Sequence, residues 1–282
     1  MVAVFAPSGA VSRQALGEGL KALQSLGLNY YLAANVYARH RYLAGNDEER
    51  AFTLAQLLSA GFPALWACRG GFGALRLLHL LEDYLPEALS RPFWVVGFSD
   101  VSLLLNYFFE KYGLLTLHAP VITSLPETGI NALATLRKLL FGGLRELVYR
   151  GQSWREGRAE GLLIGGNLAT LVSLLGTPWF PQTAGRILFL EETNESPYRV
   201  DRLFSQLRFS GALEQVKALA LGEFQGLPLE ILREIVLEHY EGPVLYGLPI
   251  GHGLENFPLL IGAPTRLFIE DHEAYLHQYL PL

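Results

Sequence analysis

Ser99 lies where two sequence patterns meet in a way that could expose a nucleophile. The apolar residues 93–96 predict a buried strand, residues 97–100 (Gly-Phe-Ser-Asp) follow it, and a helical pattern begins at Val101. A serine on such a strand-to-helix turn exposes its hydroxyl at the carboxyl end of a sheet, where neighbouring N–H groups can bind an oxyanion. The alternative is a helix N-cap, since serine and aspartate oxygens accept the free N–H groups of a first helical turn.

Two residues in the second half could complete a system for proton transfer. Residues 247–253 read Gly-Leu-Pro-Ile-Gly-His-Gly, which places His252 between two glycines directly after a predicted strand. Small neighbours let an imidazole approach a reacting group, although a polar loop histidine is the alternative reading. Glu191 ends the apolar strand predicted over residues 187–190. A carboxylate at that position could orient an imidazole and stabilise the imidazolium formed during catalysis.

The other histidines and the single cysteine favour structural roles. No two of the seven histidines show the i, i+4 spacing with an intervening glutamate that marks a helical zinc site, so we expect no metal. Asp271, His272, Glu273 and His277 could be grouped as ligands, but we interpret them as a solvated C-terminal surface. Cys68 falls inside a predicted strand and is interpreted as a small core residue, and a lone cysteine excludes an intramolecular disulfide.

Composition narrows the class of protein. The chain has 282 residues, half of them apolar and 17% charged, which is typical of a well-buried globular protein long enough for two domains. The net charge of −5 and the lack of any Lys/Arg block argue against a nucleic-acid partner. No apolar run reaches the ~18 residues of a membrane span, and the first residues lack a signal-peptide pattern. We therefore expect a soluble, cytoplasmic protein with no membrane association.

The first half of the chain alternates strands and helices, which predicts an α/β domain with a parallel sheet. One helix should begin at a capping box formed by Asn46 and Glu49. Ligands bind beyond the carboxyl ends of the strands in such sheets, so the loops at residues 70–73 and 97–100 should be neighbours. The strands are expected over residues 2–6, 30–33, 64–68, 93–96 and 114–117.

A polar, glycine-bearing stretch divides the chain into two predicted domains. We place an N-terminal α/β domain at residues 1–145, a linker at 146–160 and a smaller second domain at 161–282. In the second domain, helices are predicted over residues 168–175, 198–207 and 228–240, and strands over 161–164, 186–190, 216–221, 244–248 and 266–269.

Short motifs recur in a fixed order nearly from end to end of the chain, at residues 6–8, 68–73, 97–100, 165–168, 176–178, 188–191, 197–202 and 247–253. Together these motifs resemble the LD-carboxypeptidase family of serine peptidases, which includes muramoyl-tetrapeptide carboxypeptidases and microcin C self-immunity peptidases. Departures are modest: Phe72 and Phe98 stand where tyrosine is common, and residues 118–120 read His-Ala-Pro in place of His-Gly-Pro.

The family resemblance implies a catalytic triad of Ser99, His252 and Glu191. It also implies an oxyanion hole made by the backbone N–H groups of Gly71 and Asp100. The fold implied is a flavodoxin-like N-terminal domain with a smaller, β-rich α+β C-terminal domain, and the active site lies in the cleft between them. No metal or organic cofactor is needed, and family members are often homodimers.

The implied activity is hydrolysis of the L,D-peptide bond before the terminal D-alanine of murein tetrapeptides, which would serve cell-wall peptide recycling. Arg69, Gly70 and Phe72 would contact the substrate, with Arg69 on its C-terminal carboxylate because a guanidinium binds a carboxylate bidentately. One alternative is a microcin C-type amidase acting on aminoacyl-nucleotide analogues, for which Trp154 or Trp179 would be the aromatic platform. The other is a non-catalytic module that binds a small anionic ligand.

Overall fold

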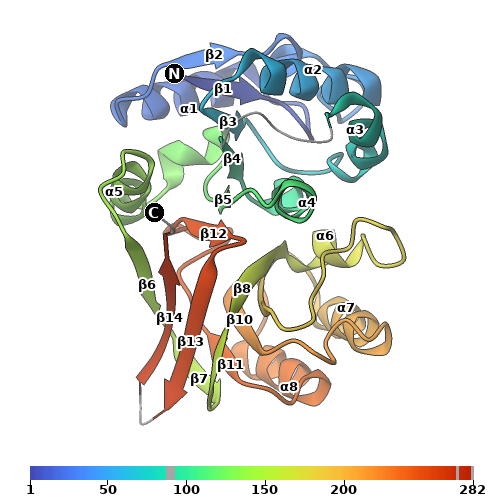
Figure 1. Cartoon of the computed structure of the whole chain (residues 1–282), viewed down its shortest axis with the longest axis vertical. Coiled ribbons are helices and arrows are strands. Elements are labelled where there is room, and N and C mark those ends of the chain that lie inside the picture. The colour runs from blue at the N-terminus through green and yellow to red at the C-terminus, as the bar shows by residue number, and fades with distance from the viewer. Residues whose placement is uncertain (87–92, 271–272, 281–282) are drawn as a thin grey trace.

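Two sheets, one above the other in Figure 1, organise the chain. The computed structural model describes residues 1–86, 93–270 and 273–280. The upper sheet has six strands in the order β12-β5-β4-β3-β1-β2, and the lower sheet has eight in the order β6-β14-β13-β8-β9-β10-β11-β7. Helices flank both sheets, so the expected mixed α/β architecture is confirmed.

The upper sheet is parallel over the five strands that alternate with helices along the chain. These strands pair in the order β2-β1-β3-β4-β5, which is the doubly wound order of flavodoxin-like proteins. The inner strands are short apolar runs buried on both faces, as parallel sheets require. Their bounds are β1 (Val2–Phe5), β2 (Tyr30–Leu32), β3 (Ala64–Ala67), β4 (Trp94–Gly97) and β5 (Thr116–His118).

Helices cover the upper sheet, and the predicted capping box opens one of them. The Glu49 N–H donates to Asn46 Oδ1 at 2.8 Å, and the Asn46 N–H donates to Glu49 Oε2 at 2.9 Å. The α-helices are α1 (Arg13–Ser25), α2 (Asp47–Ala60), α3 (Leu78–Tyr84), α4 (Ser102–Tyr112) and α5 (Ile130–Leu140). Short 3-10 turns are η1 (Ala34–Tyr37), η2 (Leu75–Leu77), η3 (Ser99–Val101) and η4 (Ile122–Glu127).

The lower sheet is mixed, with a parallel centre of β8, β9, β10 and β11 and antiparallel pairs at both ends. Helices α6 (Leu168–Val172), α7 (Pro197–Phe209) and α8 (Leu229–His239) lie together on one side of it (Figure 1). Its strands are β6 (Glu146–Arg150), β7 (Gln152–Arg155), β8 (Gly157–Asn167), β9 (Ile187–Thr193), β10 (Ala218–Gln225), β11 (Val244–Tyr246), β13 (Pro264–Glu270) and β14 (Glu273–Tyr279).

The composition of residues 146–160 predicts a linker. In the structure these residues instead form β6, β7 and the start of β8. Leu147 and Tyr149 are buried while their neighbours are exposed, and Trp154 and Ala159 are buried further along. This is the period-two pattern of a half-buried strand. The glycines and charged side chains on the exposed face concealed it in the sequence.

The C-terminal half also contributes a strand to the upper sheet. β12 (Leu259–Ile261) pairs antiparallel with β5, so that Leu259 lies opposite His118. All three residues of β12 are fully buried. The chain therefore returns to the first sheet before it completes the second, and the sequence analysis missed both this strand and β14.

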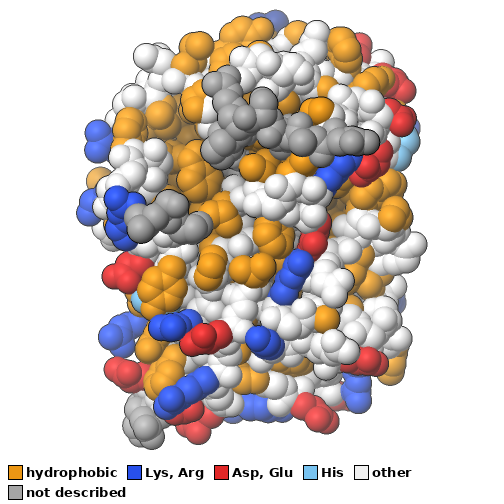
Figure 2. Space-filling model, viewed as in Figure 1, with side chains coloured by type: hydrophobic (Ala, Val, Ile, Leu, Met, Phe, Trp, Pro, Cys, Tyr) orange, Lys and Arg blue, Asp and Glu red, His pale blue; other side chains and the backbone are white. Residues whose placement is uncertain are grey.

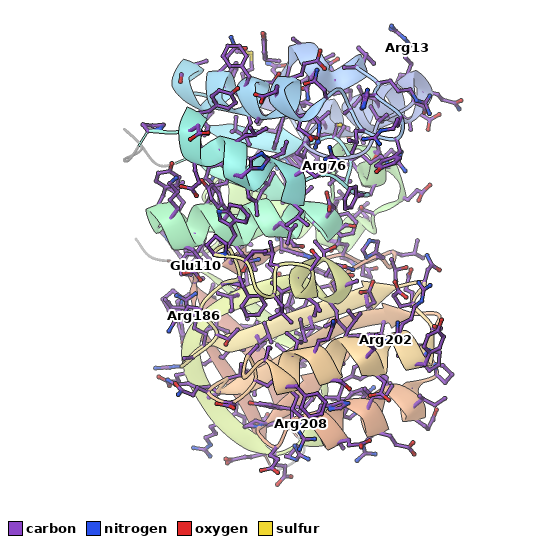
Figure 3. All side chains as sticks on the ribbon, turned by 90° about the vertical axis from the view of Figure 1, so that its right-hand side faces the viewer. Arg13, Arg76, Glu110, Arg186, Arg202 and Arg208 are labelled. Atoms are coloured by element: carbon purple, nitrogen blue, oxygen red, sulfur yellow. The ribbon has the colours of Figure 1, made fainter. Side chains whose placement is uncertain are left out.

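Helix α4 joins the two halves. The buried Asn106 side chain donates from Nδ2 to the Gly165 carbonyl at 2.8 Å, and the Gly165 N–H donates back to Asn106 Oδ1 at 3.0 Å. Further along α4, Glu110 forms an ion pair with Arg186, and the two labelled side chains lie close together between the upper and lower halves in Figure 3. These contacts fix α4, the helix that follows Ser99, relative to β8 and to the residue before β9.

The molecular surface agrees with the charge composition. On the face shown in Figure 2, Lys and Arg side chains are interspersed with Asp and Glu over the lower half, and no broad field of one sign forms there. Among the described residues, none of the helices combines the length and apolar character needed to cross a membrane.

We predict that Gly165→Ala destabilises the fold because a Cβ at this position would overlap the Phe189 carbonyl of the neighbouring strand. The control is Gly176→Ala, where φ is also positive but no atom lies within 4 Å of the added methyl. Urea unfolding should show the Gly165 variant to be about 1–3 kcal/mol less stable than the Gly176 variant. Equal stabilities would show that β8 and β9 do not approach as closely as described.

Candidate active site

Ser99 occupies a sharp turn between β4 and α4. Its φ of 60° lies in the left-handed region, which costs a residue with a side chain about 1–2 kcal/mol and is typical of a serine nucleophile turn. The alternative role as a helix cap is not realised. Phe98 is the N-cap of η3 and Val101 is the N-cap of α4, and neither position makes a side-chain cap bond.

The glycine loop lies against this turn, so the expectation that the two loops are neighbours is confirmed. A Cβ built on Gly70 would lie 3.0 Å from Ser99 Cβ and 3.2 Å from Ser99 Oγ, a spacing that only glycine leaves open. The same point is 3.5 Å from the backbone nitrogen of Asp100. Gly71 follows with a φ of 99°. Backbone N–H groups of the loop and of the turn therefore belong to one small region around Ser99.

A buried aspartate connects the turn to the glycine loop. The Asp100 side chain is 3% exposed and accepts a hydrogen bond from the Ala74 N–H at 2.8 Å. Burial raises the pKa of Asp100 above its ordinary value, although the hydrogen bond from the Ala74 N–H and the charge of Arg50 oppose that rise. Asp100 thus fixes the position of the turn through its side chain.

Arg50 on α2 holds the same loops from behind, and the sequence analysis missed it. Its buried guanidinium donates to the carbonyls of Pro7 and Gly73 and pairs with Asp47. The only sequence signal is the i, i+3 spacing of Asp47 and Arg50, which is common on exposed helices. Burial of the guanidinium depends on three chain segments meeting, so local sequence could not reveal it.

Glu191 and His252 meet at the carboxyl end of β9. His252 Nδ1 lies 2.7 Å from Glu191 Oε2, and the Glu191 side chain is fully buried. The His252 ring packs on the ring of Phe98, the residue before Ser99, with a centroid distance of 4.7 Å. A proton held on Nδ1 by the carboxylate leaves Nε2 as the basic atom of the imidazole.

The electrostatic surroundings favour the protonated form of His252. Burial alone would lower its pKa, but the hydrogen bond and charge of Glu191, helped by the charges of Glu192 and Glu223, outweigh burial and raise the pKa above its ordinary value of 6.5. His118 also packs against Phe98, but among the described residues neither of its ring nitrogens has a hydrogen-bond partner. Complete burial, together with the charge of His252, lowers the pKa of His118 to about 3.

The two adjacent glutamates have different surroundings. Glu192 accepts hydrogen bonds from Asn167 Nδ2 at 2.9 Å and from the Ala169 N–H at 2.8 Å, so it anchors the start of α6. Glu191 faces His252 instead. Within the described residues no hydrogen bond joins the Ser99 hydroxyl to His252. Catalytic hydrogen bonds often form fully only when substrate binds, so the lack of a bond between these two described residues does not argue against proton transfer from Ser99 to His252.

A small cavity of ≈ 130 Å³ opens beside His252 and Phe98. Hydroxyl, amide and carboxylate groups line it, from Ser124, Glu127, Thr128, Gln225 and Asn256.

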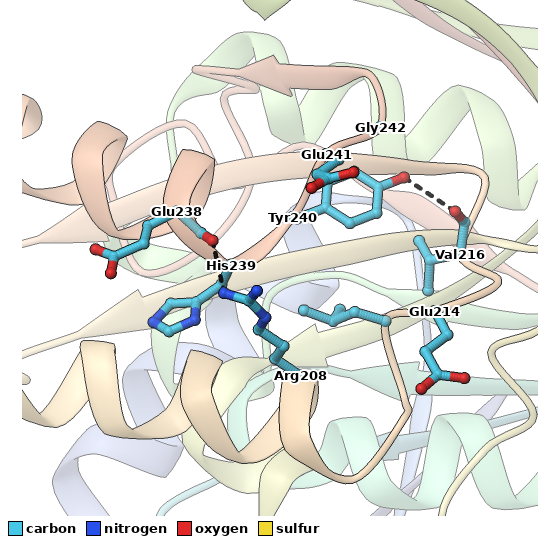
Figure 4. A pocket seen from close by; sticks show the side chains of 9 residues that line it. Arg208, Glu214, Val216, Glu238, His239, Tyr240, Glu241 and Gly242 are labelled. Atoms are coloured by element: carbon cyan, nitrogen blue, oxygen red, sulfur yellow. Dashed lines mark hydrogen bonds between the residues drawn. The ribbon is translucent and has the colours of Figure 1, made fainter.

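A larger cavity of ≈ 460 Å³, shown in Figure 4, lies at the ends of α7 and α8. It contains none of the residues that the sequence singled out. Two of its polar groups are already satisfied: Tyr240 Oη donates to the Val216 carbonyl at 3.0 Å, and Arg208 Nη1 donates to the Glu238 carbonyl at 2.9 Å. The smaller cavity is therefore the candidate site.

The predicted substrate contacts lie on the glycine-loop side of Ser99. Arg69 is exposed and donates from Nη1 to the Ala10 carbonyl at 2.6 Å, and the Phe72 ring is 44% exposed. Cys68 is completely buried, and burial raises the pKa of its thiol to about 12, which agrees with a core role. The neighbouring loop residues are thus accessible while the thiol is not.

The two tryptophans considered as aromatic platforms differ in accessibility. Trp154 is buried and stacks on Tyr246 with ring centroids 4.3 Å apart, so it is a packing residue. Trp179 is half-buried and lines a separate pocket with Lys111 and Glu110.

The described residues hold no group of three or more His, Cys, Asp or Glu side chains that could bind a metal ion. Asp271 and His272, considered as ligands in the sequence, lie outside the described part of the chain. Glu273 and His277 lie on β14, where His277 Nε2 is 2.7 Å from Glu146 Oε2.

We predict that Glu191→Gln lowers the pKa of His252, because the substitution removes the charge that opposes burial. Imidazole NMR titration should place the His252 pKa above 6.5 in the native protein and below that in the variant. Because the native pKa is raised, protonated His252 stabilises the fold below about pH 6.5, and this contribution is lost as pH rises through the native pKa. An unchanged pKa in the variant would contradict the electrostatic role of Glu191.

Comparison with known proteins identifies the family of the chain. Residues 2–119 match the LD-carboxypeptidase N-terminal domain, and residues 160–267 match the LD-carboxypeptidase C-terminal domain. The murein tetrapeptide carboxypeptidase of Pseudomonas aeruginosa is 36% identical, over 90% of this chain and 89% of that protein. The microcin C7 self-immunity protein MccF of Escherichia coli is 26% identical, over 98% and 92%.

A solved structure from the same family has a similar fold over nearly the whole chain. The muramoyltetrapeptide carboxypeptidase from Oxalobacter formigenes superposes with a TM-score of 0.85 at 28% identity, covering 99% of this chain and 98% of that one. Both halves of the chain match in order and nearly in full. The chain therefore belongs to the LD-carboxypeptidase family of peptidases.

Proposed function

We propose that this protein is a serine carboxypeptidase that removes the terminal D-alanine from murein tetrapeptides by cleaving the L,D-peptide bond. The observation that carries the proposal is the 2.7 Å contact between His252 and the buried Glu191, beside a serine in the left-handed conformation. A structural histidine–glutamate pair does not require a strained serine next to it. A triad whose serine sits on a strand-to-helix nucleophile turn accounts for both features.

In the proposed reaction, Ser99 Oγ attacks the carbonyl carbon before D-alanine while His252 Nε2 takes its proton. Glu191 holds the Nδ1 proton and stabilises the imidazolium that results. The raised pKa of His252 suits the next step, in which the imidazolium gives its proton to the leaving amine. Water then hydrolyses the acyl-enzyme, with His252 again acting as the base.

The N–H groups of Gly71 and Asp100 form the proposed oxyanion hole. Both lie next to the glycine loop and Ser99, and the Asp100 N–H belongs to the turn that begins the helical segment, where the helix dipole favours negative charge. Donors fixed in this way need little reorganisation as the oxyanion forms. Gly70 leaves room above Ser99 for the substrate, and Arg69 with Phe72 contacts its C-terminal residue.

The names of two relatives support a murein tetrapeptide as the substrate. The similar proteins of Pseudomonas aeruginosa and Oxalobacter formigenes are named for murein or muramoyl tetrapeptide carboxypeptidase activity. Burial of Trp154 removes one aromatic platform that an aminoacyl-nucleotide amidase would need. We further propose a cytoplasmic role in cell-wall peptide recycling and a homodimeric assembly. We also propose an N-terminal domain at residues 1–145 and a C-terminal domain that includes residues 161–282 together with the strands formed by 146–160.

We predict that the purified protein releases D-alanine from L-Ala-γ-D-Glu-meso-diaminopimelate-D-Ala and that Ser99→Ala does not. Loss of the nucleophile should lower kcat by about 10⁴–10⁶-fold, which mass spectrometry of the products would record as no detectable cleavage. The control is Ser173→Ala, on the exposed surface of the segment after α6, which should retain full activity.

Two results would contradict the proposal. Cleavage by Ser99→Ala at the native rate would exclude Ser99 as the nucleophile. No cleavage by the folded native protein would exclude the tetrapeptide, and hydrolysis of an aminoacyl-sulfamoyl adenosine in the same assay would then assign the amidase activity. Binding of substrate without cleavage of either compound would favour a non-catalytic module.

A further inference from the structure

Exposed arginines gather beside the glycine loop of this otherwise acidic protein. Arg41 and Arg69 are both exposed, and neither forms an ion pair with a carboxylate among the described residues. By contrast, Arg50 and Arg76 share the carboxylate of Asp47. Two positive charges without an acidic partner remain available to an anion at this position.

Backbone contacts bring the two arginines to one corner of the site. Arg69 Nη1 donates to the Ala10 carbonyl at 2.6 Å, and the Ala10 N–H donates to the Tyr42 carbonyl at 2.8 Å. The guanidinium carbon of Arg41 lies 5.5 Å from the centre of the Tyr42 ring. Gly9 continues this contact, since its N–H donates to the Gly70 carbonyl at 3.0 Å. The corner therefore adjoins the glycine that lies against Ser99.

An exposed aromatic pair completes this corner. The rings of Tyr42 and Phe72 meet edge to face with centroids 6.0 Å apart, and they are 54% and 44% exposed. Phe72 directly follows Gly71, whose N–H belongs to the proposed oxyanion hole. Arg41 itself has a φ of 58°, a left-handed conformation that is uncommon for arginine and that is often found at functional sites.

The cavity beside His252 carries the opposite charge. The cavity beside His252 includes Glu127, and Glu223 lies close enough to His252 to raise its pKa. A substrate carboxylate would be repelled there and attracted to the corner that holds Arg41 and Arg69. The C-terminal carboxylate of a carboxypeptidase substrate lies only about 4 Å beyond the scissile carbonyl, so the group that binds it must lie close to the nucleophile.

We propose that Arg41 is a specificity-determining residue that binds the free C-terminal carboxylate of the substrate together with Arg69, while the Tyr42–Phe72 pair contacts the terminal D-alanine side chain. This inference rests on the proposed function. It explains how the site selects an end of a peptide, because an amide or an extended chain lacks the second charged oxygen that a guanidinium pair can bind.

Arg41→Gln tests the proposal without disturbing the loop. The Arg41 guanidinium makes no hydrogen bond to another described residue, whereas Arg69 is tied to Ala10. We expect kcat/KM for L-Ala-γ-D-Glu-meso-diaminopimelate-D-Ala to fall about 10–100-fold. The same peptide with a C-terminal amide should be hydrolysed slowly and equally by both proteins. The acid-to-amide ratio of kcat/KM should therefore collapse, with an unchanged Tm.

Arg233→Gln is the matched control, since it removes an equal charge from the exposed surface of α8. It should retain the native acid-to-amide ratio, and Arg41→Lys should recover part of that ratio because it restores the charge. The proposal is overturned if Arg41→Gln keeps the native ratio. If the native protein releases no D-alanine from the acid, the proposed function itself fails and this inference fails with it.

Discussion

The contact of α4 with β8 is the constraint on which the site depends. Ser99 follows a strand of the upper sheet, while Glu191 lies in the lower sheet and His252 in a loop that follows one of its strands. The reciprocal hydrogen bonds between the buried Asn106 and Gly165 fix α4 against β8. Because Asn167 on β8 lies opposite Glu191 on β9, the same contact sets the position of the carboxylate. Proton transfer from Ser99 to His252 requires that the two halves of the chain hold these side chains at a fixed separation.

Within that frame, electrostatics gives each group a separate role. A fully buried carboxylate is unfavourable unless it has a partner, and His252 is the partner of Glu191. The pair makes His252 a stronger base, whereas burial holds the neighbouring His118, which has no hydrogen-bond partner among the described residues, in its neutral form. Asp100 and Arg50 use buried charge for a different purpose, since they fix the two loops that surround Ser99.

The sequence predicted those parts of the molecule that depend on local patterns. Alternating strands and helices indicated the parallel sheet, and the glycines at 70, 71, 73 and 97 indicated loops that meet. It could not reveal Arg50, Asn106 or β12, because their roles depend on contacts between segments distant in the chain. Residues 146–160 were misread because the exposed side of β6 and β7 is as polar as a linker.

The most direct test of the account is covalent labelling with a fluorophosphonate, followed by intact-protein and peptide mass spectrometry. A serine activated by His252 should gain one phosphonyl group at Ser99, and the adduct should be lost in His252→Ala, because the unassisted hydroxyl is a weak nucleophile. An adduct at another residue, or none on the folded native protein, would contradict the claim that Ser99, His252 and Glu191 act as one catalytic unit.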